Sequence, residues 1–186
     1  MAGTEVLMAG FGGQGMLLSV KLLAYAVMKK GMEVSWLPSY GPEMRGGTAN
    51  VTVCLSDNPV GSPYISKPRA LLVMNQPSLE KFGPRVKPGG LIVVNTSLVP
   101  IEANRKDCTV VYIAAGELAQ KAGTIRAANL VMLGAYVGWA GIVDKDTTIA
   151  MIKKEFKKKA KFIPANVAAF KLGYEEGRKA RKGKQA

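Results

Sequence analysis

A short glycine-rich segment near the N-terminus constrains the fold of this chain more than any other feature. The run Gly10-Phe11-Gly12-Gly13-Gln14-Gly15 follows the apolar residues Val6-Leu7-Met8-Ala9 and leads into a helix-like stretch from Met16 to Lys30. Strand, glycine turn and helix in this order form the context in which backbone N–H groups at a helix N-terminus bind a phosphate. Glycine suits the turn because a Cβ would block a left-handed backbone and the close approach of a ligand. The segment therefore predicts an anion site at Gly12, Gly13, Gln14 and Gly15.

A second glycine-rich loop follows the next predicted strand and reads Ser39-Tyr40-Gly41-Pro42-Glu43-Met44-Arg45-Gly46-Gly47. Consecutive glycine N–H groups can turn toward an anion, and the planar guanidinium of Arg45 suits a phosphate or a carboxylate. The alternative is a structural loop in which Arg45 pairs with Glu43. Because loops of this length usually carry function, we favour a binding role, which the loop would perform through Tyr40, Arg45, Gly46 and Gly47.

Strand-like and helix-like segments alternate along most of the chain. The expected strands are Glu5–Gly10, Glu33–Leu37, Thr48–Ser56, Ala70–Met74, Leu91–Asn95 and Cys108–Ile113, with Pro38 closing the second. Continuous apolar runs such as 91–95 are typical of strands covered on both faces. We therefore predict an α/β fold, a Rossmann-like three-layer α/β/α sandwich around a mostly parallel sheet. Ligands of such sheets bind beyond the carboxyl ends of the strands, where both glycine loops lie.

The 186 residues fit one domain, expected over residues 1–177, with a basic, flexible tail over residues 178–186. Residues 127–139 are apolar nearly all round and include Gly134 and Gly138, so this helix should be buried or should face a partner. Asp146 is the expected N-cap of the next helix. Trp36 and Trp139 are expected in the core.

Composition excludes several kinds of chemistry. The chain has no histidine, which removes Ser-His-Asp and Cys-His catalysis, and its two cysteines form neither a disulfide framework nor a metal-cluster motif. We therefore expect no catalytic residue and no metal ligand in this chain.

No apolar run reaches the ~20 residues needed to cross a bilayer, and the N-terminus does not resemble a signal peptide. A cytoplasmic protein without a membrane partner is expected.

Positive charge is concentrated toward the C-terminus. Twelve Lys or Arg lie between Met151 and Ala186 against three Glu, in a chain whose formal net charge is +13. This balance leaves a basic nucleic-acid-binding protein open as an alternative function. We favour a solvated helix face and tail, because no aromatic residues alternate with the lysines to stack bases. Docking onto an acidic partner is a third possibility.

A free-standing nucleotide-dependent oxidoreductase is the other alternative. Its dinucleotide fingerprint places an acidic residue at the end of the second strand, where it binds the ribose 2′-OH. That end reads Trp36-Leu37-Pro38-Ser39 and holds no carboxylate. Glu33 lies nearly the required number of residues after the glycine turn, but it stands at the start of the second strand rather than at its end. The missing acid argues against an NAD enzyme.

Taken together, the two loops resemble those of the γ subunit of 2-oxoacid:ferredoxin oxidoreductases, most closely of the 2-oxoglutarate and branched-chain 2-oxoacid types. The similarity spans roughly residues 5–140, and the Tyr-Gly-Pro-Glu-Met-Arg-Gly-Gly block is its most specific part. The matching stretches are Gly10-Phe11-Gly12-Gly13-Gln14-Gly15, residues 39–50, Met74-Asn75-Gln76-Pro77-Ser78-Leu79 and Ala128-Asn129-Leu130-Val131-Met132-Leu133-Gly134.

The resemblance implies a subunit that is not catalytic alone. In that family a 2-oxoacid is decarboxylated on thiamine diphosphate, two electrons pass through iron–sulfur clusters to ferredoxin, and the acyl group passes to coenzyme A. Alpha, beta and ferredoxin-type subunits hold the thiamine and the clusters, so this chain is expected to bind no cofactor tightly by itself. Coenzyme A is the expected co-substrate. Its contact with Gly12, Gly13, Gln14, Gly15, Tyr40, Arg45, Gly46 and Gly47 is our hypothesis.

Overall fold

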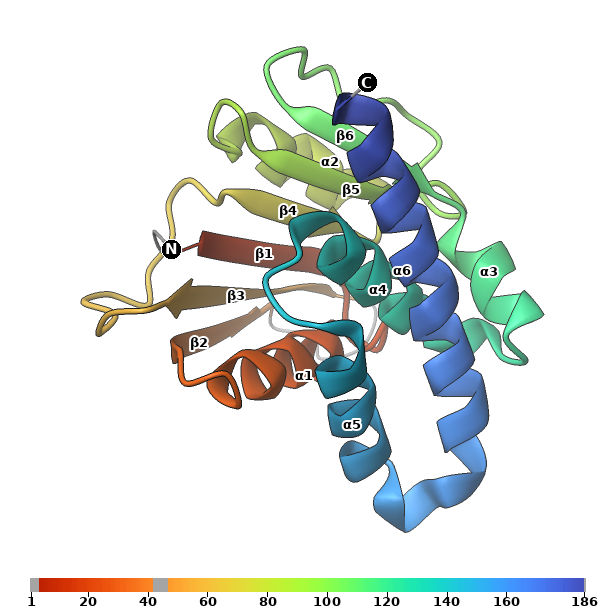
Figure 1. Ribbon diagram of the computed structural model, residues 1–186. Helices are drawn as coiled ribbons and strands as arrows, with labels where there is room; N and C mark the ends of the chain where they lie inside the picture. The colour runs from red at the N-terminus through yellow and green to blue at the C-terminus, as the bar shows by residue number, and fades with distance from the viewer. Residues whose placement is uncertain (1–3, 42–46, 186) are drawn as a thin grey trace.

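A single six-stranded sheet forms the centre of the protein. The structure, a computed structural model, describes residues 4–41 and 47–185. The strands lie in the order β2-β3-β1-β4-β5-β6 (Figure 1). Their bounds are β1 Thr4–Phe11, β2 Glu33–Tyr40, β3 Thr48–Ser56, β4 Ala70–Val73, β5 Leu91–Asn95 and β6 Thr109–Ile113. All six expected strands are therefore present, with ends shifted by at most a few residues.

The sheet is mixed, and its parallel part is the larger. Pairs β1–β4, β4–β5 and β5–β6 are parallel, whereas β3 runs antiparallel to both β1 and β2. Strand β2 therefore points the same way as β1, and the carboxyl ends of β1, β2, β4 and β5 share one edge of the sheet. The predicted α/β fold is confirmed.

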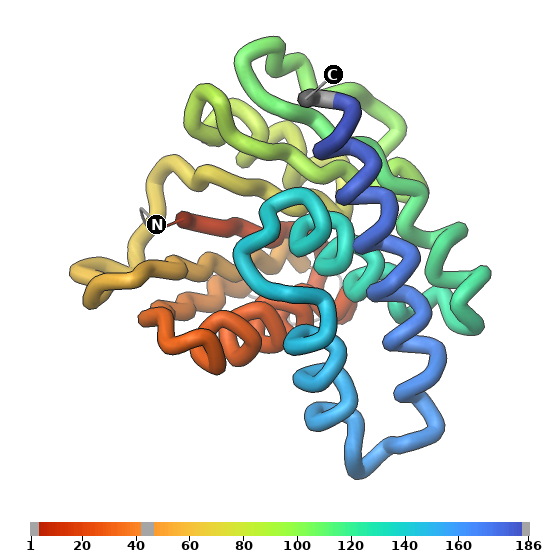
Figure 2. Tube along the Cα trace, viewed as in Figure 1, coloured from red at the N-terminus to blue at the C-terminus, as the bar shows by residue number. Residues whose placement is uncertain are grey.

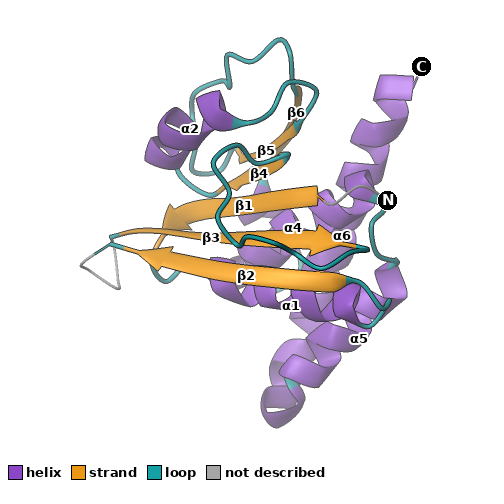
Figure 3. Cartoon of the chain, turned by 90° about the vertical axis from the view of Figure 1, so that its left-hand side faces the viewer, coloured by secondary structure: helices purple, strands orange, loops and turns teal. Residues whose placement is uncertain are grey.

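Helices cover the two faces of the sheet unequally. Helices α1, α3, α4, α5 and α6 contribute to the core on one face. The short α2 covers β4, β5 and part of β1 on the other (Figure 3). The helices are α1 Met16–Met28, α2 Gln76–Phe82, α3 Ala115–Lys121, α4 Ala128–Ala140, α5 Lys145–Glu155 and α6 Ile163–Gln185. Three short 3₁₀ helices, η1 Gly83–Arg85, η2 Ile125–Ala127 and η3 Lys157–Phe162, join them. The larger core lies between the sheet and these five helices.

Helices α4 and α6 approach each other until their backbones touch. Each carries two glycines four residues apart, Gly134 and Gly138 on α4 and Gly173 and Gly177 on α6. A Cβ at Gly177 would overlap the backbone carbonyl of Ala135, and a Cβ at any of the other three glycines would also overlap a backbone oxygen of the opposite helix. The two helices run side by side in the chain trace (Figure 2). The apolar helix expected to be buried or to face a partner is thus covered by its own chain.

Strand β2 continues past the proline that was expected to close it. Pro38 lies within β2, which pairs only with β3 and is an edge strand. Proline is tolerated at such an edge because its missing N–H can face away from the neighbour. Trp36, expected in the core, is 43% exposed on this strand, so that expectation was wrong.

The helical termini differ from expectation in two places. Asp144, rather than Asp146, caps α5 by accepting a hydrogen bond from the Thr147 N–H at 2.7 Å, and this bond lowers the pKa of its carboxyl. Helix α6 also runs through residues 178–185, where a flexible tail was expected. Residues there pack on the chain, since Ala180 contacts the core and the guanidinium of Arg181 lies close to Gly141.

Over the described residues, no helix combines the length and apolarity needed to cross a membrane.

The glycine contact predicts contrasting effects of one substitution at two places in α6. Gly177→Ala should destabilise the protein by about 1–3 kcal/mol, because the new methyl overlaps backbone that cannot move aside. At Gly183 no atom of the described residues outside its own helix lies within 4 Å of the point that a methyl group would occupy, so Gly183→Ala should leave stability unchanged or raise it by up to about 1 kcal/mol. Chemical denaturation of both variants measures the difference. Equal effects would contradict the close helix contact.

Candidate functional site

The glycine turn lies where the winding of the sheet reverses. The chain leaves β1, builds β2 and β3 on one side of it, and then returns to form β4 on the other side. Helix α1, which follows β1, packs on one face of the sheet, and α2, which follows β4, packs on the opposite face. Ligands of open α/β sheets bind at the carboxyl edge beside such a reversal. The predicted anion site thus occupies the expected place in the topology.

The two glycine-rich loops meet at this edge. The second loop connects β2 and β3 as a hairpin, which the hydrogen bond from the Gly41 N–H to the Thr48 carbonyl closes at 2.9 Å. The N–H of Gly12 donates to the carbonyl of Gly47, also at 2.9 Å. Loops more than thirty residues apart in the sequence are therefore bonded to each other. Arg45 and Gly46 lie outside the described residues.

Gln14 holds the glycine turn in shape. Its Oε1 accepts a hydrogen bond from the Phe11 N–H at 2.7 Å, and its Nε2 donates to the carbonyl of Met74 at 3.5 Å. The space above Gly10 is filled as a result, because a Cβ there would overlap Gln14 Oε1 and lie 2.7 Å from Cβ of Met74. Both ends of the Gln14 amide are therefore hydrogen-bonded to the backbone around the turn. Only backbone groups of the turn remain available to a ligand.

Asn129 ties the turn to helix α4. Its Nδ2 donates to the Gly15 carbonyl at 2.9 Å and to Oγ of Ser19 at 3.0 Å, while Ser19 Oγ donates to the Asn129 carbonyl at 3.0 Å. Gly15 has φ +79°, and a Cβ there would lie 2.7 Å from Asn129 Nδ2. Both the backbone conformation and the neighbour therefore require glycine. The Asn129 motif noted in the sequence has a structural role here.

The remaining predicted residues are accessible. Gly13 is exposed and has φ +96°, and no atom of residues 4–41 or 47–185 lies within 4 Å of the point that a Cβ would occupy. Tyr40, at the end of β2, is 48% exposed at the same edge. Of the six described candidates, Gly12, Gln14, Gly15 and Gly47 take part in the hydrogen bonds that hold the loops. Gly13 and the Tyr40 side chain remain accessible within the described part of the chain.

A pocket of about 310 Å³ lies against the glycine turn, on the side of α6. Most of the residues that line this pocket could not be predicted from the sequence, because they lie in η2, η3 and α6, which only the tertiary fold brings to the turn. The Ala128-Asn129 motif was the one local signal of this neighbourhood. The lining residues are Gly13, Gln14, Gly15, Leu18, Thr124, Arg126, Asn129, Phe156, Lys159, Phe162 and Asn166.

Two asparagines at the carboxyl ends of β4 and β5 form hydrogen bonds with the backbone. Oδ1 of Asn75 accepts from the Ser78 N–H at 3.0 Å and caps α2. Oδ1 of Asn95 accepts from the N–H groups of Ser97 and Ala115, at 3.2 and 3.3 Å. Both side chains are buried, so neither reaches a ligand at the surface.

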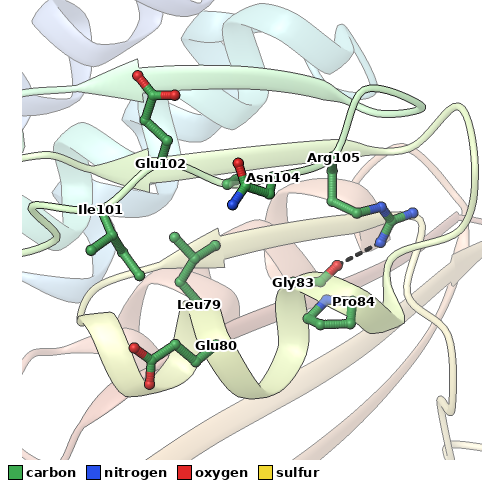
Figure 4. A pocket seen from close by; sticks show the side chains of 9 residues that line it. Leu79, Glu80, Gly83, Pro84, Ile101, Glu102, Asn104 and Arg105 are labelled. Carbon is green, nitrogen blue, oxygen red and sulfur yellow. Dashed lines mark hydrogen bonds between the residues drawn. The ribbon is translucent and has the colours of Figure 1, made fainter.

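A second pocket of about 310 Å³ lies between α2 and residues 101–105 (Figure 4). Its cation, Arg105, donates to the carbonyls of Gly83 and Val86 at 2.6 and 2.7 Å and pairs with Asp107. The Arg105 guanidinium lowers the pKa of the Asp107 carboxyl through this pair. The guanidinium is thus occupied by the fold, and the pocket offers little to an anion.

The cysteines do not fit an iron–sulfur cluster. Cys54 Sγ donates to the Ser62 carbonyl at 3.8 Å, and Cys108 Sγ donates to the Lys87 carbonyl at 3.6 Å. Burial and the nearby carboxylate of Glu5 raise the pKa of the Cys54 thiol, so the thiolate form that binds metals is disfavoured. Within residues 4–41 and 47–185, no three metal-ligating side chains come together.

The family profile and the most similar sequences that the comparisons found all belong to oxidoreductases of 2-oxoacids. A profile of the pyruvate ferredoxin/flavodoxin oxidoreductase family matches residues 5–176. Ketoisovalerate oxidoreductase subunit VorA of Methanothermobacter thermautotrophicus is 39% identical over 176 residues, which are 94% of this chain and 36% of that protein. The chain therefore spans just over a third of that relative. 2-oxoglutarate synthase subunit KorC of Methanocaldococcus jannaschii is 33% identical over 174 residues, 92% of each protein.

Solved structures of similar proteins share the whole fold. The gamma subunit of keto/oxoacid ferredoxin oxidoreductase from Geobacter sulfurreducens superimposes with a TM-score of 0.81 at 29% identity, covering 95% of this chain and 99% of that one. Pyruvate oxidoreductase subunit PORC from Thermotoga maritima superimposes with a TM-score of 0.78 at 25% identity, covering 94% and 97%. The fold is thus found in separate subunits of similar length.

Removing the Asn129 side chain should loosen the glycine turn. Asn129→Ala leaves the buried Ser19 hydroxyl without one partner, and we expect a loss of about 1–3 kcal/mol in the free energy of unfolding. Asn104 is exposed and has no side-chain hydrogen bond to the described part of the chain, so Asn104→Ala is the matched control and should change stability by less than about 0.5 kcal/mol. Denaturant titration compares the two. A similar small change in both would show that Asn129 does not hold the turn.

Proposed function

Because this chain belongs to the pyruvate ferredoxin/flavodoxin oxidoreductase family, we propose that it is the gamma subunit of a multi-subunit 2-oxoacid:ferredoxin oxidoreductase. The resemblance found in the two glycine loops is confirmed at the level of the family. The assembled enzyme would convert a 2-oxoacid, coenzyme A and oxidised ferredoxin into an acyl-coenzyme A, carbon dioxide, a proton and ferredoxin reduced by two electrons. Relatives named for ketoisovalerate and 2-oxoglutarate support a substrate of one of these two kinds.

The junction of the two glycine loops is the observation that carries this proposal. The Gly12–Gly47 hydrogen bond brings the turn and the hairpin together at the carboxyl edge, where a phosphate-bearing co-substrate would approach. The chain has no histidine and offers no group of metal ligands in its described residues. These features favour a subunit that positions coenzyme A over one that performs the chemistry.

The cofactors of the reaction belong to other subunits in this proposal. Thiamine diphosphate would stabilise the carbanion left by decarboxylation, and iron–sulfur clusters would carry the electrons, in alpha, beta and ferredoxin-type partners. The half-buried cysteines of this chain, each donating to a backbone carbonyl, support that division. We place the complex in the cytoplasm, without a membrane or a nucleic-acid partner.

The residues of the junction have two roles in the coenzyme A site that we propose. Gly12, Gln14 and Gly15 hold the turn, as their hydrogen bonds and close contacts indicate. Gly47 joins the loops through its carbonyl, Gly13 and Tyr40 are accessible beside them, and Arg45 with Gly46 would complete the site from the hairpin. Arg45 would supply the charge, because a guanidinium binds phosphate oxygens in a planar, two-pronged contact.

Activity should depend on the partners. Ferredoxin or viologen reduction with a 2-oxoacid and coenzyme A is expected only after alpha and beta subunits are added to this chain. Absorbance of the reduced acceptor measures the rate. Turnover by the purified chain alone would favour the free-standing enzyme, and nucleic-acid binding that weakens steeply with salt would favour the basic nucleic-acid-binding protein.

Arg45→Ala should affect the two substrates of the assembled enzyme differently. Losing one charge-assisted contact to a phosphate costs about 1.5–3 kcal/mol, so the apparent KM for coenzyme A should rise roughly ten- to a hundredfold while the KM for the oxoacid changes little. Arg178→Ala, at an exposed position in α6, is the control. Equal changes in both KM values, or no change in either, would contradict a contact with coenzyme A and would indicate that Arg45 has only a structural role in the loop.

A further inference from the structure

A groove of about 850 Å³ lies where α5 packs against α1 (Figure 1). Helix α1 contributes four residues at positions i, i+4, i+7 and i+8 from Lys21, a spacing that places them on one side of the helix. Helix α5 contributes three residues at positions i, i+3 and i+4 from Met151, and the start of η3 adds Lys157 and Lys158. The lining includes no residue of the glycine turn or of the β2–β3 hairpin, so the groove is separate from the proposed coenzyme A site.

Positive charge dominates this groove. Five lysines line it, against the single carboxylate of Glu155. That carboxylate is already paired with the amine of Lys21 at 3.0 Å. The other four lysines form no ion pair with any residue in the ranges 4–41 and 47–185; they are Lys29, Lys154, Lys157 and Lys158. Because like charges along one groove repel each other, the carboxylates of a bound partner would relieve the repulsion.

The groove also exposes apolar surface among its lysines. Tyr25 and Met28, neighbours on the surface of α1, are 47% and 54% exposed. Met151 of α5 is half-buried and lines the same groove. Methionine is flexible and polarisable, so it adapts to the apolar side chains of a partner, and the lysine stems add further apolar area. A ligand that fits this surface therefore needs both apolar side chains and carboxylates.

The combination of charge and apolar surface favours one kind of partner. The lysines would hold a nucleic acid through its phosphates, and the two methionines would then contribute nothing to binding. An amphipathic helix uses both features, because its apolar side chains insert between α1 and α5 while the carboxylates beside them reach the lysines. Residues 21–29 extend about 12 Å along the axis of α1, which is room for about two turns of such a helix.

We propose that the groove between α1 and α5 docks an acidic amphipathic helix of another protein. The apolar side chains of that helix contact Tyr25, Met28 and Met151, and its carboxylates pair with the lysines of the groove, Lys154 and Lys158 among them. Part of the positive charge concentrated toward the C-terminus thus serves to bind an acidic partner rather than only to keep a helix face solvated.

Fluorescence anisotropy of a labelled synthetic peptide, titrated with the full chain at physiological ionic strength, tests the proposal. The probe is a helical peptide of about 12 residues with leucines along one face and glutamates beside them. Its control is a permuted peptide of the same composition without a leucine face. The probe should bind at least about tenfold more tightly than the permuted peptide, because it alone can bury leucines against the methionines while its glutamates reach the lysines.

One substitution tests the apolar contact. Met28→Ala should weaken binding of the probe about fivefold, because the methionine side chain loses most of the area that the leucines would cover. Leu98→Ala is the matched control, since Leu98 is 53% exposed and lies outside the groove, and it should leave the affinity unchanged. Both positions are exposed, so both variants should fold normally. An unchanged affinity in Met28→Ala would contradict docking in the groove.

A pair of double variants tests the charge. Lys154→Glu combined with Lys158→Glu should weaken binding of the probe about tenfold or more, because each exposed ion pair contributes up to about fivefold and the reversal adds repulsion. Lys171→Glu combined with Lys182→Glu makes the same change of net charge on the exposed surface of α6 and should alter the affinity less than twofold.

Three results would overturn the proposal. One is failure of the probe to bind the unmodified chain, and another is equal binding of the probe and the permuted peptide. Equal weakening by the two double variants is the third, because general attraction to a basic chain would then explain the binding. A DNA duplex should not displace the probe; displacement at a lower concentration than the unlabelled probe requires would assign the groove to nucleic acid instead.

Discussion

The backbone contact between α4 and α6 positions the residues that reach the glycine turn from these two helices. Glycines on both helices let the two backbones touch, and this contact fixes α4 against the sheet. Asn129, near the start of α4, then bonds to Gly15 and Ser19 and so places the turn. The same packing brings Asn166, near the start of α6, to the turn from the other side. The pocket beside the turn therefore depends on this helix pair.

Features encoded by neighbouring residues could be predicted from the sequence. The strand, turn and helix at residues 4–28 were expected because apolar runs and glycine spacing act locally, and β3 was expected over its full length. The family was also recognisable, because its loop motifs are continuous in sequence. Pro38 misled the prediction of β2, since a proline that ends a central strand can lie within an edge strand.

Features created by tertiary packing could not be predicted in the same way. Arg126, Lys159 and Asn166 belong to three different elements, and no local pattern indicates that they share a pocket. The Gln14 amide and the Gly12 N–H, both in the predicted anion site, form hydrogen bonds within the loops that the sequence does not indicate. A glycine-rich motif predicts where the backbone bends. It does not predict which backbone N–H groups stay available to a ligand, because that depends on the hydrogen bonds that the rest of the fold makes with the turn.

The glycine contact also has a consequence for synthesis on the ribosome. Helix α4 needs α6 to cover its apolar surface, and the contacts of Gly173 and Gly177 lie about forty residues after those of Gly134 and Gly138. The nascent chain therefore exposes a nearly all-apolar helix until α6 has left the exit tunnel.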